Sequence, residues 1–206
     1  MKLKHLFLWM VCALVAATTF TSCLDDDDDE KTRENALAAV ANMTGVYKGK
    51  MTAHNAKEYT DTTEVTWTCD TSGIHILDFP VSTLADCMTG DSTLQAELRK
   101  MGTATMLVSF QLYQIGKTEY DFYTGPSMTF DVTYGGITRK LGVLFDPKGL
   151  GGNGYYTLGF YSTDSRSMSF SMAVTGLYEQ VGTQQATLEG WNGYLYYMLT
   201  SSPKEY

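Results

Sequence analysis

The residue types that most often carry chemistry are sparse in this chain of 206 residues. Three histidines are present, and the first of them, His5, lies in a segment with the features of a cleaved leader. His54 falls in a polar stretch that predicts a loop, and His75 alternates with two isoleucines, which predicts a side chain on the outer face of a strand. Zinc needs three or four well-spaced ligands, and these residues do not supply them. We therefore expect two solvated histidines, no metal and no cofactor.

The sequence contains no catalytic signature that specifies a reaction. It has no G-x-S-x-G nucleophile elbow, although a Ser-His-Asp triad stays open because its members need not be adjacent. Residues 149–154 match the dinucleotide pattern G-x-G-x-x-G, but the residues that follow are typical of a strand and not of the required helix. Acid pairs for glycoside hydrolysis could be drawn from a scattered set: Glu58, Asp61, Glu64, Asp121 and Asp131. We expect no enzyme, with a glycan hydrolase as the catalytic alternative.

The first 22 residues predict a signal peptide. Lys2 and Lys4 precede an uncharged apolar run over residues 6–17, which is followed by small and polar residues. As a helix this run is about 18 Å long, shorter than the roughly 30 Å of a hydrocarbon core, so it would target the chain without anchoring it. The sequence FTSC at residues 20–23 resembles a bacterial lipobox, with Phe20 in place of the usual leucine. The resemblance implies that Cys23 becomes lipidated and holds the protein at the outer membrane, whereas an ordinary secretory peptide is the alternative.

Residues 24–30 contain six acids, and a block of like charge stays solvated. This pattern predicts a flexible tether over residues 23–31. Its position resembles the export signal of surface-displayed lipoproteins of gut bacteria, which implies exposure at the cell surface. Of 15 basic and 23 acidic residues, the leader removes two bases and the tether six acids, which leaves 13 against 17, a charge of −4. A domain without basic excess argues against a nucleic-acid partner.

The remaining sequence changes from a helical period to a period of two. Ala36, Leu37, Val40 and Met43 recur at helical spacing, which predicts one amphipathic helix over residues 32–43 that packs on a sheet. Residues 44–206 then alternate in about eight to ten segments, interrupted by one or two short helical insertions within residues 82–101. Gly135 and Gly136 suit a two-residue hairpin turn. We expect a mainly β domain, an antiparallel meander that hides its edges as a barrel or a sandwich.

Two short segments of this domain resemble a known group of proteins. The sequences GVYKGK at residues 45–50 and DFPV at residues 78–81 are similar to uncharacterised calycin-like, or lipocalin-like, surface lipoproteins of gut bacteria. The resemblance covers residues 45–199 and implies a calycin-like barrel. It implies little about activity, because a fold does not fix a function.

Cys69 and Cys87 are the two cysteines of the predicted domain. In an oxidising compartment they are expected to form a disulfide that closes a loop of about 18 residues, and two separate thiols are the alternative. Short Asp-Thr-Thr and Asp-Ser-Thr sequences around Thr62 and Ser92 resemble acceptors for protein O-glycosylation in these bacteria.

Aromatic residues are the strongest indication of a binding site. The segment at residues 194–197, YLYY, is apolar at both strand parities, so one face can fill a core while the other could line a cavity, support the helix or present a platform. A neutral or apolar small molecule or a glycan is the expected ligand, held by Tyr155, Tyr156, Trp191, Tyr194 and Tyr196. The sequence thus predicts an outer-membrane module for binding or display, whose partner could also be a surface protein. A structural or assembly component without a ligand is the alternative.

Overall fold

The computed structural model describes residues 26–55, 60–146 and 158–205. The predicted leader, Cys23, Glu58, the glycine-rich residues 149–154 and the pair Tyr155 and Tyr156 lie outside these ranges. Within them, no helix combines the length and the apolar character needed to cross a membrane.

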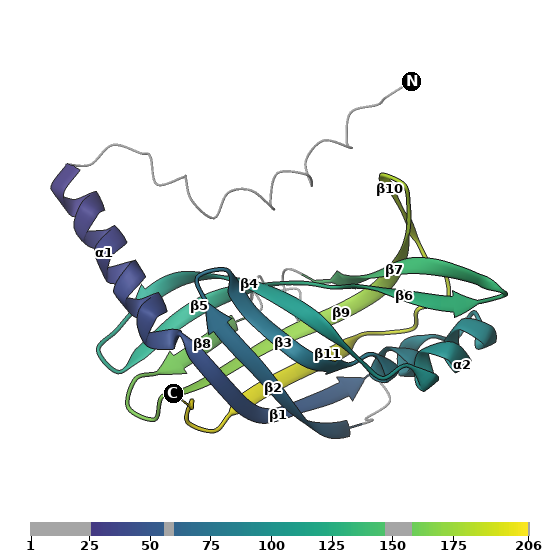
Figure 1. The fold of residues 1–206 in the computed structure, drawn as a ribbon, viewed down its shortest axis with the longest axis horizontal. Coiled ribbons are helices and arrows are strands. Elements are labelled where there is room, and N and C mark those ends of the chain that lie inside the picture. The colour runs from purple at the N-terminus through teal and green to yellow at the C-terminus, as the bar shows by residue number, and fades with distance from the viewer. Residues whose placement is uncertain (1–25, 56–59, 147–157, 206) are drawn as a thin grey trace. The chain divides into compact units, whose positions relative to one another are not determined.

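Eight antiparallel strands close into a barrel (Figure 1). The hydrogen-bonded order is β11-β1-β2-β3-β4-β5-β8-β9, and β9 pairs back with β11. Closure leaves the barrel wall without an unpaired edge, which is the physical reason for a barrel in place of a sandwich. The barrel strands are β1 (Gly45–Asn55), β2 (Thr60–Asp70), β3 (Gly73–Pro80), β4 (Thr103–Ile115), β5 (Glu119–Ser127), β8 (Leu158–Ser162), β9 (Ser167–Val181) and β11 (Leu195–Ser201).

Strand β9 continues beyond the barrel and carries a second, smaller sheet. Its first half pairs with β8 and β11, and its second half pairs with β7 (Ile137–Phe145) and β10 (Gln184–Thr187). β6 (Thr129–Tyr134) pairs with β7, and the connecting Gly135 and Gly136 both have positive φ, as the sequence predicts for this hairpin. The described residues therefore form eleven strands. The four residues of β10 are all exposed, so they carry no alternating pattern that would predict a strand.

Large side chains from the barrel strands fill its interior. Tyr47 stacks on Trp67 with ring centroids 5.9 Å apart, Trp67 meets Phe170 edge-on at 5.6 Å, and Phe79 meets Tyr197 at 5.1 Å. Each such buried side chain stabilises the fold by about 1.5–3 kcal/mol. An eight-stranded barrel is just wide enough to be filled in this way or to hold one small ligand, and here rings occupy the interior.

Helix α1 (Asp26–Met43) begins six residues before the helix that the sequence predicts. It includes most of the acidic run assigned to the tether. Residues 36–206 make one compact unit, in which Ala39 and Met43 join the core. Leu37, expected on the apolar face, is 58% exposed, because a residue two positions before Ala39 points to the opposite side of a helix.

Two short helices complete the described elements. The 3-10 helix η1 (Val81–Cys87) follows β3 and buries Val81, Leu84 and Ala85. Helix α2 (Ser92–Lys100) buries Leu94 and Leu98, and it packs against η1 and β6. These two elements are the helical insertions predicted within residues 82–101.

Candidate functional site

The predicted aromatic residues that the structure describes do not line the barrel interior. On β11, Leu195, Tyr197 and Leu199 point inward and are buried, so Tyr196 points outward and is half-buried. Trp191 packs against the core, pairs with Met88 in an isolated bridge and donates from Nε1 to the Gly193 carbonyl at 3.0 Å. Tyr194 is exposed. The ring that enters the barrel from this segment is Tyr197, which the prediction left out.

The 3-10 helix η1 closes the barrel at the end where β1 finishes. We call this the η1 end. Thr83 of η1 donates from Oγ1 to the Pro80 carbonyl at 2.8 Å. The same Thr83 oxygen lies 2.7 Å from the Tyr197 hydroxyl. Because the single hydrogen of the Thr83 hydroxyl is used in the bond to Pro80, the Tyr197 hydroxyl is the donor in this second bond. Burial raises the pKa of Tyr197 and keeps this hydroxyl protonated. The polar tip of the ring is satisfied by η1, and the η1 helix covers this end with buried side chains.

The opposite end, where β1 begins, is called the α1 end. Here the Tyr47 hydroxyl donates to the Met43 carbonyl in the last turn of α1. Asn42 donates from Nδ2 to the Tyr120 hydroxyl at 2.8 Å. Burial raises the pKa of Tyr47, so this group also stays a neutral donor.

Two buried side-chain nitrogens in the described ranges have no acceptor, Nε1 of Trp67 and Nε of Arg139.

An apolar stripe remains exposed on the outside of the barrel and crosses neighbouring strands. Met198 on β11 is paired with Ser171 on β9, whose hydroxyl donates to the Leu158 carbonyl at 3.4 Å. Leu158 on β8 is paired with Tyr123 on β5, and Tyr123 stacks on Tyr113 of β4 with centroids 4.4 Å apart. Phe160, 45% exposed, lies beside them and is paired with Ser169. We call the following set the outer stripe: Tyr113, Tyr123, Leu158, Phe160, Ser169, Ser171, Tyr196 and Met198.

Of the outer stripe, the sequence predicted Tyr196 alone. The signal for the others was present in their alternation: Phe160 stands between the buried Gly159 and Tyr161, so its parity already placed it outside. Pairing across strands, which joins residues far apart in sequence, is what gathers them.

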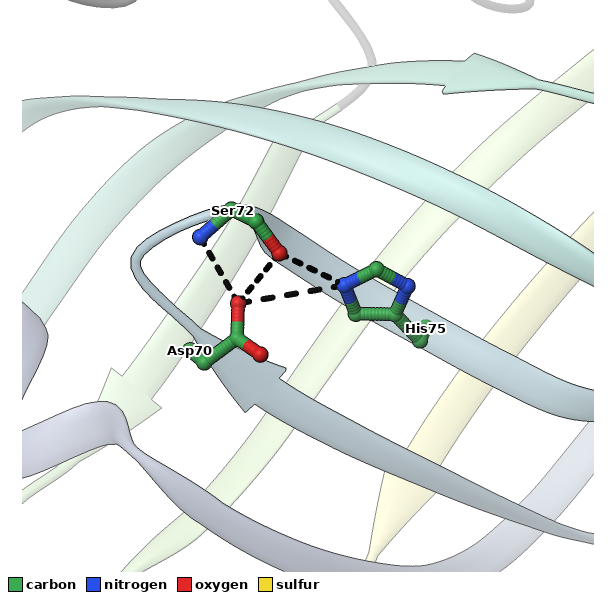
Figure 2. A network of polar contacts seen from close by, with 3 residues as sticks. All are labelled: Asp70, Ser72 and His75. Carbon is green, nitrogen blue, oxygen red and sulfur yellow. Dashed lines mark hydrogen bonds and ion pairs between the residues drawn. The ribbon is translucent and has the colours of Figure 1, made fainter.

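A serine, a histidine and an aspartate meet at the turn between β2 and β3 (Figure 2). Asp70 Oδ1 accepts bonds from the Ser72 amide at 2.7 Å and the Ser72 hydroxyl at 2.5 Å. Nε2 of His75 lies 2.8 Å from the Ser72 hydroxyl and 3.8 Å from Asp70 Oδ1. The bonds from Ser72, with a smaller contribution from His75, hold the pKa of Asp70 below its ordinary value.

This arrangement differs from a catalytic relay. In a triad the aspartate binds one ring nitrogen of the histidine and the serine binds the other. Here one nitrogen, Nε2, faces both Ser72 and Asp70, and the serine hydroxyl is already bonded to the carboxylate. The network therefore stabilises a tight turn between two strands. His75 lies on the outer side of β3, as expected. His54 belongs to β1, so the prediction of a loop is wrong. The polar residues around it do not exclude a strand, because the solvent-facing side of a strand needs no apolar residues.

The acids considered for hydrolysis are distributed over separate strands. Asp61 and Glu64 lie on β2, Asp121 on β5 and Asp131 on β6. Glu64 is 3.9 Å from Lys50 in an exposed pair. Among the described residues, no group of three or more histidines, cysteines and acids is placed to hold a metal ion. Thr62 on β2 and Ser92 at the start of α2, the two predicted acceptors for glycosylation, are both exposed.

The predicted disulfide between Cys69 and Cys87 is absent from the structure, which keeps two buried thiols. Cys69 pairs with Ile74 at the α1 end, whereas Cys87 ends η1 at the other end, with Sγ 3.7 Å from the Tyr194 carbonyl. The six steps along β3 from Ile74 to Pro80 alone extend about 20 Å along the barrel. A disulfide requires Cα atoms within about 7 Å, so the barrel separates the two cysteines too far.

Comparison with known proteins gives one match. Residues 42–179 match a family described as a domain of unknown function (DUF4840). No curated protein and no solved structure matches the chain at a significant level. The matched range starts in the last turn of α1 and ends within β9, so it leaves β10 and β11 outside.

Proposed function

We propose that this chain, which belongs to the family described as a domain of unknown function (DUF4840), is a lipid-anchored outer-membrane protein that binds or displays through the outside of its barrel. The observation that carries the proposal is the distribution of rings. The barrel fills its own interior with aromatic side chains, while the outer stripe places four more rings on the outside of β4, β5, β8 and β11, where Tyr113 and Phe160 are exposed.

Support for the location comes from the N-terminal sequence. A short leader, a cysteine at residue 23 and an acidic run follow one another in the order of a surface lipoprotein. Two or three acyl chains on Cys23 would give stable attachment, because each buried CH2 contributes about 0.8 kcal/mol. The membrane is thus the first proposed partner.

Support for a calycin-like architecture comes from eight antiparallel strands and an N-terminal helix that packs on the barrel through Met43. Barrels of this size either hold a small ligand or are filled by side chains. We assign this protein to the second kind, so its ligand would bind outside.

A neutral glycan is the ligand class that fits the outer stripe best. Flat rings such as Phe160 and Tyr113 can cover the apolar face of a sugar, and the hydroxyl oxygen of Ser169, the strand partner of Phe160, could accept a bond from a sugar hydroxyl. Two acids of β5 lie at this part of the wall, Asp121, which is paired with Phe160, and Glu119. A small apolar ligand, a surface protein and a purely structural role are the alternatives.

Location is tested by proteinase accessibility on whole cells. The native chain should be digested, whereas replacing the five aspartates at 25–29 by alanine should protect it in the periplasm. Cys23→Ala should release the protein from membranes and remove its acyl mass. An intact mass without acyl groups, unchanged by Cys23→Ala, would contradict the anchor.

Binding is tested by affinity electrophoresis through neutral polysaccharides. Phe160→Ser and Tyr196→Ser should abolish the retardation of the native chain. Ile137→Ser, at an apolar residue on β7 that is even more exposed than Phe160, is the control and should leave it unchanged. If no polysaccharide retards the native chain, the glycan assignment fails and the structural role is favoured.

A further inference from the structure

The C-terminal segment after β11 folds back across the α1 end of the barrel. The Ser202 amide donates to the Lys48 carbonyl and the Glu205 amide to the Val46 carbonyl, each at 2.9 Å. Between them, the Lys204 amide donates at 2.9 Å to the carbonyl of Arg166 in the turn before β9. We call residues 202–205 the C-terminal strap. It connects β1 to the β8–β9 turn, two parts of the wall at the same end.

Lys204 fixes the strap to the last turn of α1. Its Nζ donates to the Asn42 carbonyl at 2.5 Å and to the Thr44 carbonyl at 2.8 Å. The last carbonyls of a helix lack partners within the helix, and a cation near them is favourable. Helix α1 has no basic residue in its own last turn, so Lys204 supplies this cap from the other end of the chain.

The side chain of Lys204 also covers buried groups beneath the strap. Its Nζ lies 5.9 Å from the centroid of the Tyr161 ring. A Cβ added to Gly45 would lie 3.0 Å from Lys204 Cδ, and Gly45 is the strand partner of Cys69. Burial raises the pKa of Cys69 to about 12, while the ammonium of Lys204 lowers it, which agrees with their proximity. Burial likewise lowers the pKa of Lys204.

The two ends of the barrel are closed by different means. At the η1 end, Val81, Leu84 and Ala85 are buried, so uncovering it would expose apolar core. In the strap, Ser202, Pro203 and Glu205 are exposed, and the ion pair between Glu205 and Lys48 at 3.0 Å is on the surface. Segments with few buried apolar contacts open at lower free energy than the core does. The strap is therefore the part of the α1 end that can open locally, whereas Ala39 and Met43 of α1 are buried in the core.

We propose that the C-terminal strap is a latch over the α1 end of the barrel, that Lys204 holds it shut, and that its release exposes the Cys69 thiol without unfolding the barrel. The proposal concerns this end only and does not depend on the outer stripe or on the lipid anchor. An open latch would give a small thiol-reactive or apolar molecule a route to Tyr47, Tyr161 and Cys69.

The two cysteines make the test internally controlled. The full-length protein is treated under native conditions with N-ethylmaleimide, and peptide mass spectrometry follows the modification of Cys69 and Cys87 separately. Lys204→Met keeps most of the side-chain volume and removes the cation. We expect it to accelerate modification of Cys69 by about tenfold or more and to leave Cys87 unchanged, because the opening population sets the rate. Removing the ammonium of Lys204 disfavours the thiolate of Cys69, which is the reactive form, and would by itself slow the reaction. A faster reaction of Lys204→Met therefore reports greater access of the reagent to Cys69.

Two further variants keep the outcome interpretable. A chain ending at Ser201, which removes the strap, should accelerate Cys69 at least as much as Lys204→Met does. Lys117→Met, at an exposed lysine between β4 and β5, is the matched control and should change neither rate. An unchanged Cys69 rate in both strap variants overturns the proposal, and so does equal acceleration of Cys69 and Cys87, which would report global unfolding.

Discussion

Adjacent residues in β11 have opposite surroundings. Tyr197 is fully buried and bonded to Thr83, whereas Tyr196 lies on the outer wall opposite His54. The same amino acid therefore contributes to the core at one position and to the outer stripe at the next, because successive strand residues point to opposite faces. A hydroxyl inside the barrel must find a partner, and one on the wall can use water.

Replacing each of these tyrosines by phenylalanine separates the two roles. Tyr197→Phe removes a buried hydrogen bond while Thr83 keeps its bond to Pro80, so we expect a loss of about 0.5–1.5 kcal/mol in the free energy of unfolding. Tyr196→Phe should change it by less than about 0.5 kcal/mol. Urea denaturation measures both, and equal losses would contradict the assignment of the inner and outer faces.

The Asp70 network predicts a pH-dependent contribution to stability. Bonds from Ser72 lower the pKa of Asp70 from its ordinary value of 3.8, so folding favours the ionised carboxylate. This stability is present above the unfolded pKa and is lost as pH falls through the lower folded pKa. Ser72→Ala should therefore unfold more easily than the native chain at pH 6, and the difference should shrink below about pH 4. A difference in denaturation midpoint that is constant from pH 6 to pH 2.5 would contradict this.

Helix α2 shows how one element depends on its first residue. Asp91 accepts bonds from the amides of Thr93 at 2.9 Å and Leu94 at 3.0 Å, which would otherwise lack acceptors at the helix start. Arg99 and Lys100 occupy the last turn, where cations are favourable. The helix is thus held at both ends, its residues Leu94 and Leu98 are buried, and it packs against β6 and η1.

Removing the cap should weaken this element measurably. Asp91→Ala is expected to lower the free energy of unfolding by about 0.5–2 kcal/mol. Asp131→Ala, which removes an exposed acid from β6, should stay within about 0.5 kcal/mol of the native chain. Calorimetric or urea unfolding compares the two, and similar values for both would show that the cap contributes no more than a surface acid.

The molecule as a whole depends on its last strand. β11 pairs with β1 on one side and with β9 on the other, so it closes the barrel between segments separated by more than a hundred residues. The family match ends at residue 179, before this strand. Without β11, two wall strands would expose unpaired edges, which favours aggregation.

A chain truncated after residue 179 should therefore fail to fold. We expect it to lack a cooperative unfolding transition and to aggregate, whereas the chain ending at Ser201 keeps β11 and should unfold cooperatively. Circular dichroism and size-exclusion chromatography of the two truncations provide the measurement. A soluble, cooperatively folding chain of 179 residues would contradict the role given to β11.

The sequence by itself determined the elements whose signal is local. An alternation of period two placed the isoleucines at 74 and 76 on the inner face of a strand, and two glycines placed the β6–β7 hairpin, because strand faces and tight turns depend on residues only a few positions apart. The tertiary structure decided what depends on distant partners. The pairing of β1 with β11, for example of Gly49 with Ser201, makes the sheet a barrel and not a sandwich. The strands also place Cys69 and Cys87 at opposite ends of the barrel. The tertiary structure also gathered the outer stripe from five strands, since strand pairing over long separations is not encoded in the spacing of neighbouring residues.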